Sequence, residues 1–96
     1  MNSKYIENAN KYGTVTFEGV EYALTCDADC SNRFLPFGVN WFDASFGETY
    51  MFEMTAYAID KKGAKYEISW IFEDVKGEEK DLDCHDYNDV CSVRAL

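Results

Sequence analysis

The chain has 96 residues, of which 47% are hydrophobic and 17% aromatic, and its formal net charge is −9. This length allows one domain, residues 1–96, and excludes barrel enzymes and two-domain cleft enzymes. The hydrophobic fraction is too high for a disordered chain, and the negative charge argues against direct binding to DNA or RNA, whose phosphates attract cationic side chains.

Residues 1–13 are mostly polar, and their main apolar side chains are Tyr5, Ile6 and Tyr12. Ser3 is the expected N-cap of a short helix ending near Gly13. Because so few apolar residues anchor it, a loosely docked segment is the alternative. This terminus lacks the apolar stretch of a signal peptide, and no run approaches the roughly 18 apolar residues of a membrane span. We therefore expect a cytoplasmic protein that does not bind membranes.

Two segments show the period-two alternation of half-buried strands. Residues 14–17 and 20–24 alternate around Glu18-Gly19, which predicts a hairpin. Residues 49–73 predict a long antiparallel hairpin with its turn at residues 60–63. Its even-numbered apolar side chains should meet in the core.

The remaining segments are less regular. Residues 26–48 contain turn formers and many large apolar side chains, most of which we expect in the core, although an aromatic loop is also an interface candidate. In that second case Trp41 and Phe42 would be exposed anchors. Residues 90–96 predict a closing strand or a helical turn. The expected fold is mostly β: a small antiparallel meander or partly open barrel of four to five strands, with the N-terminal helix as an option.

The four cysteines have spacings that fit no common zinc motif well. Cys26 and Cys30 are separated by three residues, Cys84 and Cys91 by six, and His85 follows Cys84. Reduced cysteines acting as small hydrophobic side chains are favoured. A disulfide or a zinc site is the alternative, and it would make the protein a small metal-binding or redox-sensitive module. We expect no cofactor.

No catalytic signature is present. His85 is the only histidine, and no nucleophile is spaced to work with it as a base. A solvated histidine in an acidic loop is the simpler interpretation. Asp27 with Asp29, or Asp81 with Asp83, could bind a hard cation, but the calcium-loop pattern is absent. We expect a binding protein and not an enzyme.

The strongest signal is an acidic segment, residues 73–89. Eight acidic residues and two lysines give it a net charge of −6 out of −9 for the chain. If this segment is extended, Asp81 and Asp83 lie on one face about 7 Å apart, close to the spacing of phosphates along a nucleic-acid strand. A row of carboxylates could then occupy a basic groove made for DNA or RNA. A solvated acidic loop that maintains solubility is the alternative.

Three further segments, Val20–Thr25, Thr55–Asp60 and Gly63–Trp70, together resemble small proteins of phages and mobile elements. That group includes anti-CRISPR inhibitors, many of which look like nucleic-acid mimics. The resemblance implies a phage-encoded inhibitor in the host cytoplasm that blocks a basic nucleic-acid-binding protein such as a Cas effector. A toxin-immunity protein would fit the same acidic surface. The expected partner-binding residues are Glu78, Glu79, Asp81, Asp83, Asp86, Asp89, Trp41 and Phe42.

Overall fold

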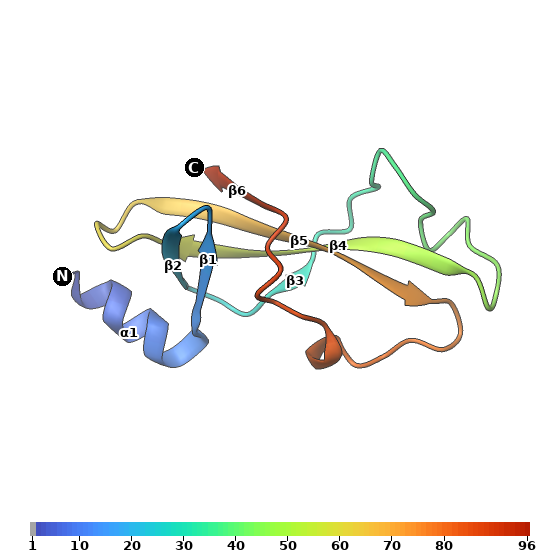
Figure 1. Ribbon diagram of the computed structural model, residues 1–96, viewed down its shortest axis with the longest axis horizontal. Helices are drawn as coiled ribbons and strands as arrows, with labels where there is room; N and C mark the ends of the chain where they lie inside the picture. The colour runs from blue at the N-terminus through green and yellow to red at the C-terminus, as the bar shows by residue number, and fades with distance from the viewer. Residues whose placement is uncertain (1) are drawn as a thin grey trace.

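A computed structural model describes residues 2–96, which form an elongated, mostly β structure (Figure 1). Its principal extents are 49 × 24 × 21 Å. The elements in chain order are α1 Ser3–Tyr12, β1 Thr14–Phe17, β2 Val20–Leu24, β3 Asp29–Cys30, β4 Thr49–Ile59, β5 Lys65–Val75, the 3-10 helix η1 Leu82–Cys84 and β6 Ser92–Ala95. No helix within residues 2–96 is long and apolar enough to cross a membrane.

The strands form one open antiparallel sheet. Their order is β1-β2-β4-β5-β6, and β3 lies beside β4. The prediction of a mostly β, antiparallel fold is therefore confirmed. The sheet has six strands, more than expected, because the two-residue β3 and the closing β6 both join it. β2 and β3 lie end to end along β4: β2 pairs with Ala58 and Ile59, and β3 with Met54 and Thr55.

The β4–β5 hairpin is the long axis of the molecule, as Figure 1 shows. Every residue of β4 pairs with β5. The carboxylate of Asp60 closes the turn, because its Oδ1 accepts hydrogen bonds from the N–H groups of Lys62 and Ala64 at 2.9 and 3.0 Å. Gly63 takes a φ of +88° there, a conformation that glycine adopts without steric cost.

The even-numbered side chains of this hairpin form the core, as predicted. Met54, Ile68 and Trp70 are the largest fully buried side chains. The indole Nε1 of Trp70 donates a hydrogen bond to the carbonyl oxygen of Tyr87 at 2.8 Å. The ring of Tyr87 also packs edge-on against Trp70 and Phe72. The chain around Tyr87 is therefore held over the core face of the sheet.

Helix α1 packs at the end of the hairpin that carries the turn. The side chain of Asn2, not Ser3, caps it: its Oδ1 accepts a hydrogen bond from the N–H of Lys4 at 2.8 Å. The prediction of Ser3 as the cap was therefore wrong by one residue. Tyr5 is only 4% exposed and packs with Ala23 and Ile59. One buried aromatic ring thus anchors the helix, for which a loosely docked segment was the alternative expectation.

The flanking strands stop short of the other end of the hairpin. β6 pairs with β5 only as far as Ser69, and β3 pairs with β4 only at Met54 and Thr55. Beyond these points, two long loops, residues 31–48 and 76–91, run around the end of the hairpin (Figure 1). These loops carry the aromatic and acidic residues that the sequence analysis identified, so this end of the molecule holds the candidate site.

Candidate protein-binding surface

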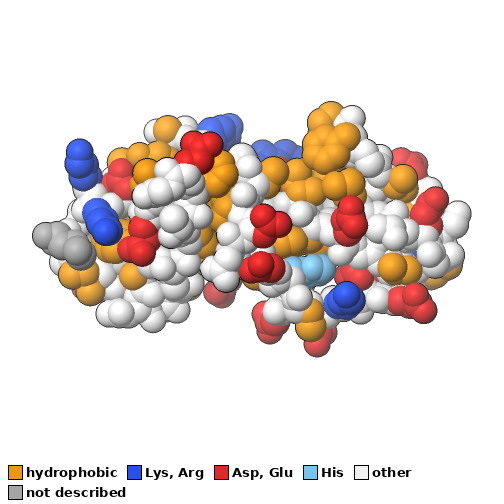
Figure 2. All heavy atoms as spheres, in the orientation of Figure 1, with side chains coloured by type: hydrophobic (Ala, Val, Ile, Leu, Met, Phe, Trp, Pro, Cys, Tyr) orange, Lys and Arg blue, Asp and Glu red, His pale blue; other side chains and the backbone are white. Residues whose placement is uncertain are grey.

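The predicted acidic residues are exposed on the loop end of the molecule. Figure 2 shows acidic side chains gathered over this half, beside hydrophobic side chains. Within the acidic segment one carboxylate is an exception, because Asp74 is buried. The exposed members of the predicted set are Glu78, Glu79, Asp81, Asp83, Asp86 and Asp89.

The backbone of the acidic segment is folded and not extended, which corrects the expected row of carboxylates. Residues Leu82–Cys84 form η1. The N–H of Cys84 bonds to the carbonyl of Asp81 at 2.9 Å, and a turn closes between Asp86 and Asp89. The extended-strand spacing of Asp81 and Asp83 therefore does not apply. Tyr87 of this segment packs against the core, and the spacing of an extended strand does not describe the turned backbone that brings it there.

The side chain of His85 is mostly covered by its neighbours, so the expectation of a solvated histidine was wrong. Its side chain is 9% exposed, and its Nε2 lies 3.7 Å from Oδ2 of Asp74. The ring stacks on Phe72 with a centroid distance of 4.7 Å and meets Phe52 edge-on. Asp74 also accepts a hydrogen bond from the N–H of Lys80 at 3.0 Å. The carboxylate of Asp74 thus holds the backbone at Lys80, and the ring of His85 packs the chain after η1 against Phe72 of the hairpin.

The aromatic residues of the 31–48 loop are exposed, although most were expected in the core. Trp41 and Phe42, the predicted anchors, are 44% and 74% exposed. Phe34 contacts Phe42, and Phe42 contacts Trp41 edge-on at 5.3 Å. We call Phe34, Trp41 and Phe42 the aromatic cluster. The sequence analysis identified two of its members and missed Phe34, because no pattern distinguishes exposed from buried rings in an irregular loop.

Lys76 holds this loop in place, which the sequence analysis did not predict. Its Nζ donates hydrogen bonds to the carbonyl oxygens of Trp41 and Ala44, both at 3.0 Å. The ammonium lies 4.1 Å from the centroid of the Trp41 ring, a cation–π contact. Its backbone also pairs with Gly47 and Glu48. Lys76 therefore couples the start of the acidic segment to the 31–48 loop.

Two adjoining cavities flank Trp41, and we call them together the Trp41 groove. One, of about 300 Å³, lies toward the acidic segment. The other, of about 470 Å³, lies toward Phe34 and Phe42. Both are lined by Cys30, Trp41 and Phe52. The groove therefore joins the aromatic cluster to the acidic segment across the surface of β4.

The side of the groove toward the acidic segment is electronegative. Asp74 and Glu79 line the smaller cavity together with Tyr50. Burial first, and then the charges of these two carboxylates, raise the pKa of the Tyr50 phenol. Backbone hydrogen bonds, chiefly from the N–H of Gly77, hold the pKa of Glu79 below its ordinary value. Glu79 therefore stays ionised at neutral pH.

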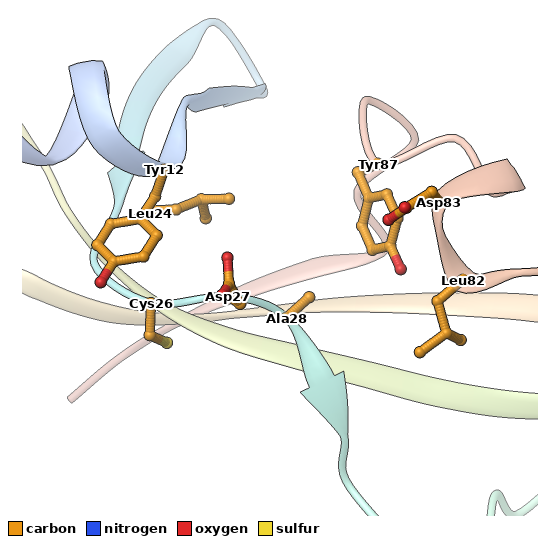
Figure 3. A pocket seen from close by; sticks show the side chains of 8 residues that line it. All are labelled: Tyr12, Leu24, Cys26, Asp27, Ala28, Leu82, Asp83 and Tyr87. Atoms are coloured by element: carbon orange, nitrogen blue, oxygen red, sulfur yellow. The ribbon is translucent and has the colours of Figure 1, made fainter.

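A third cavity, of about 520 Å³, lies where the helical end meets the acidic segment (Figure 3). Residues near the end of α1 and β2 face the acidic segment across it, with one carboxylate on each side, Asp27 and Asp83. Leu82 lines this cavity and also the smaller cavity of the Trp41 groove. The remaining lining residues are Tyr12, Leu24, Cys26, Ala28 and Tyr87.

The cysteines do not assemble into a site. All four are free thiols; Cys26 is half-buried, and Cys30, Cys84 and Cys91 are exposed. The thiol of Cys26 accepts a hydrogen bond from the N–H of Tyr57 where β2 breaks before β3. Within residues 2–96, no three His, Cys, Asp or Glu side chains converge to hold a metal ion. The expectation that the thiols are buried or half-buried holds only for Cys26.

No family model matches this chain, and comparisons with curated proteins and with solved structures likewise return no match. The chemistry of the surface is therefore the basis on which a function can be proposed.

Proposed function

We propose that this protein is a stoichiometric inhibitor that binds a basic nucleic-acid-binding protein. A phage-encoded blocker of a host defence protein, with a Cas effector as the leading target, is the specific form of the proposal. The protein acts by occupying the basic surface of the target and not by catalysis. Its contact surface is the exposed part of the acidic segment together with the aromatic cluster.

The observation that carries the proposal is the position of exposed aromatic rings beside a concentration of carboxylates. Phe42 is 74% exposed, and large exposed apolar groups on a small protein mark interaction sites. The few residues that dominate binding energy at protein interfaces are enriched in large aromatic side chains, whereas charges at the rim speed association and select the partner. A negatively charged rim selects a positively charged partner, and nucleic-acid-binding proteins carry basic patches where they contact the phosphates.

The structure modifies the mimicry that the sequence suggested. Since the acidic segment is folded around η1, its carboxylates do not form a phosphate-like row. Complementarity of charge, with apolar anchoring, is the mode of binding that we propose. A toxin-immunity protein would use the same surface on a basic nuclease, and the choice of target in the test distinguishes the two.

The test is inhibition of purified RNA-guided nucleases, measured as the block of their binding to labelled target DNA at low and high salt. We expect inhibition at low salt that weakens as salt rises. The double variant Asp81→Lys, Asp83→Lys should abolish inhibition, because both side chains are exposed and the change reverses two charges of the acidic segment.

The matched control is Glu7→Lys, Glu18→Lys, which makes the same change of charge at the helical end, where both residues are exposed. This control should still inhibit. Equal loss in both double variants would show a non-specific effect of net charge and would contradict the proposal. Inhibition of a basic toxin nuclease, but of none of the RNA-guided nucleases, would favour the immunity function.

A further inference from the structure

The smaller cavity of the Trp41 groove has apolar walls. Rings of Trp41, Tyr50 and Phe52 and the side chain of Leu82 line it. Its volume of about 300 Å³ is at the lower end of the roughly 300–1,000 Å³ of small-molecule pockets. It therefore suits one large side chain better than an extended ligand. An apolar side chain fits it best, because a polar group would lose hydrogen bonds to water without regaining them.

The rim of the same cavity is acidic. Glu79 is exposed and ionised, and the exposed Asp81 adjoins Leu82 in sequence. Lys80 is the only cation among the lining residues, which also include the two carboxylates of Asp74 and Glu79. Lys76, the other lysine of the acidic segment, is engaged with the 31–48 loop. An apolar cavity with a carboxylate rim is complementary to an apolar side chain flanked by cations.

We propose that the Trp41 groove binds a basic segment of the partner protein by taking one large apolar side chain of that segment into its smaller cavity, while flanking Arg and Lys side chains pair with Glu79 and Asp81. This inference depends on the proposed function and adds to it the chemistry of the partner. The occupant is a basic amphipathic peptide segment, and a phosphate-binding groove alone would not fill the cavity.

The test uses two synthetic peptides of identical Arg and Lys content that differ at one central position, phenylalanine in one and serine in the other. Burial of a phenylalanine side chain predicts binding about tenfold tighter for the phenylalanine peptide. The measurement is the dissociation constant of each peptide for the full chain by calorimetry. Equal affinities for both peptides would overturn the proposal that the groove binds an apolar side chain. They would not contradict the proposal that the acidic surface binds a basic partner. Binding of neither would overturn both proposals.

Two variants separate the cavity from the charge. Leu82→Ala removes a wall of the cavity at a side chain that is half exposed, so the fold should persist. It should reduce the preference for the phenylalanine peptide to about twofold, whereas Leu96→Ala, at an exposed apolar residue of the C-terminus, should leave the preference unchanged. Asp81→Lys, Asp83→Lys should weaken both peptides and keep the preference. A preference that survives Leu82→Ala would contradict the assignment of the cavity.

Cys30 provides a second readout in the unaltered protein, because its exposed thiol lines both parts of the groove. Cys91 is also exposed and lies on the opposite edge of the hairpin, where its N–H bonds to Ser69. The phenylalanine peptide should slow alkylation of Cys30 by iodoacetamide at least fivefold and leave Cys91 unaffected, as measured by peptide mass spectrometry. Equal protection of both thiols by either peptide would show charge screening alone and would overturn the proposal.

Discussion

The aromatic residues that pack around the two ends of the β4–β5 hairpin differ in their exposure to solvent. At the helical end, Tyr5 of α1 and Tyr22 of β2 are both buried. At the loop end, Phe42 and Phe46 are 74% and 82% exposed. The helical end has flanking elements that cover the hairpin, whereas the loop end extends past β3 and β6. In the segments that flank the hairpin, the coverage that neighbouring elements provide, and not the residue type, decides which rings are available to a partner.

The largest expected effect sharpens this comparison by removing a buried ring. Trp70→Ala should lower the free energy of unfolding by about 3–5 kcal/mol, because it opens a cavity and removes the hydrogen bond to Tyr87. That loss is a large share of the roughly 5–15 kcal/mol of a typical domain. Phe42→Ala, at an exposed ring, should change the free energy of unfolding by no more than about 0.5 kcal/mol. Urea denaturation of both variants measures the difference, and similar losses would contradict the assignment of Phe42 to the surface.

The next effect concerns Lys76, the residue that holds the exposed rings in place. Lys76→Met should lower the free energy of unfolding by about 1–2 kcal/mol, because two charge-assisted hydrogen bonds and a cation–π contact are lost. The fluorescence of Trp41 in the native state should change as well. Lys80→Met is the matched control, since only its backbone N–H binds Asp74. If Lys80→Met costs as much stability, the anchoring role of Lys76 is wrong.

A smaller effect tests the cap of α1 at the opposite end. Asn2→Ala should lower the free energy of unfolding by about 1 kcal/mol, because it removes the carboxamide oxygen that accepts a hydrogen bond from the N–H of Lys4. Ser3→Ala should be nearly neutral, since Ser3 is an exposed residue within the helix. Thermal unfolding followed by circular dichroism compares the two variants. A larger loss of stability for Ser3→Ala than for Asn2→Ala would show that Ser3 is the N-cap, as the sequence predicted.

The smallest effect is confined to alkaline pH. Burial, with the hydrogen bond to Glu21, raises the pKa of Tyr5 to about 12. A raised pKa in the folded state means that the unfolded state ionises first, so this contribution to stability is complete below pH 10 and is lost between about pH 10 and 12. Tyr5→Phe should flatten that part of the stability profile. Urea midpoints across this range test it, and an unchanged slope would show that Tyr5 is accessible to solvent.

Much of the fold was predictable because it depends on local patterns. The alternation in residues 49–73 identified the hairpin, its turn and its core face, and Met54, Ile68 and Trp70 are buried accordingly. The candidate site was predictable only as a set of residue types. Charge identified the acidic segment, and aromatic content identified Trp41 and Phe42, but neither reveals the folded backbone around η1 or the groove between them.

The amino-acid sequence by itself determined which side chains of the hairpin share a face, because successive side chains of a strand point to opposite sides of the sheet whatever surrounds it. Only the tertiary structure decided three features. They are the exposure of the aromatic residues in the 31–48 loop, the packing of His85 on Phe72 and the hydrogen bond from Lys76 to that loop. These outcomes depend on contacts between residues distant in the chain. Such contacts exist only once the chain has folded, so no local pattern encodes them.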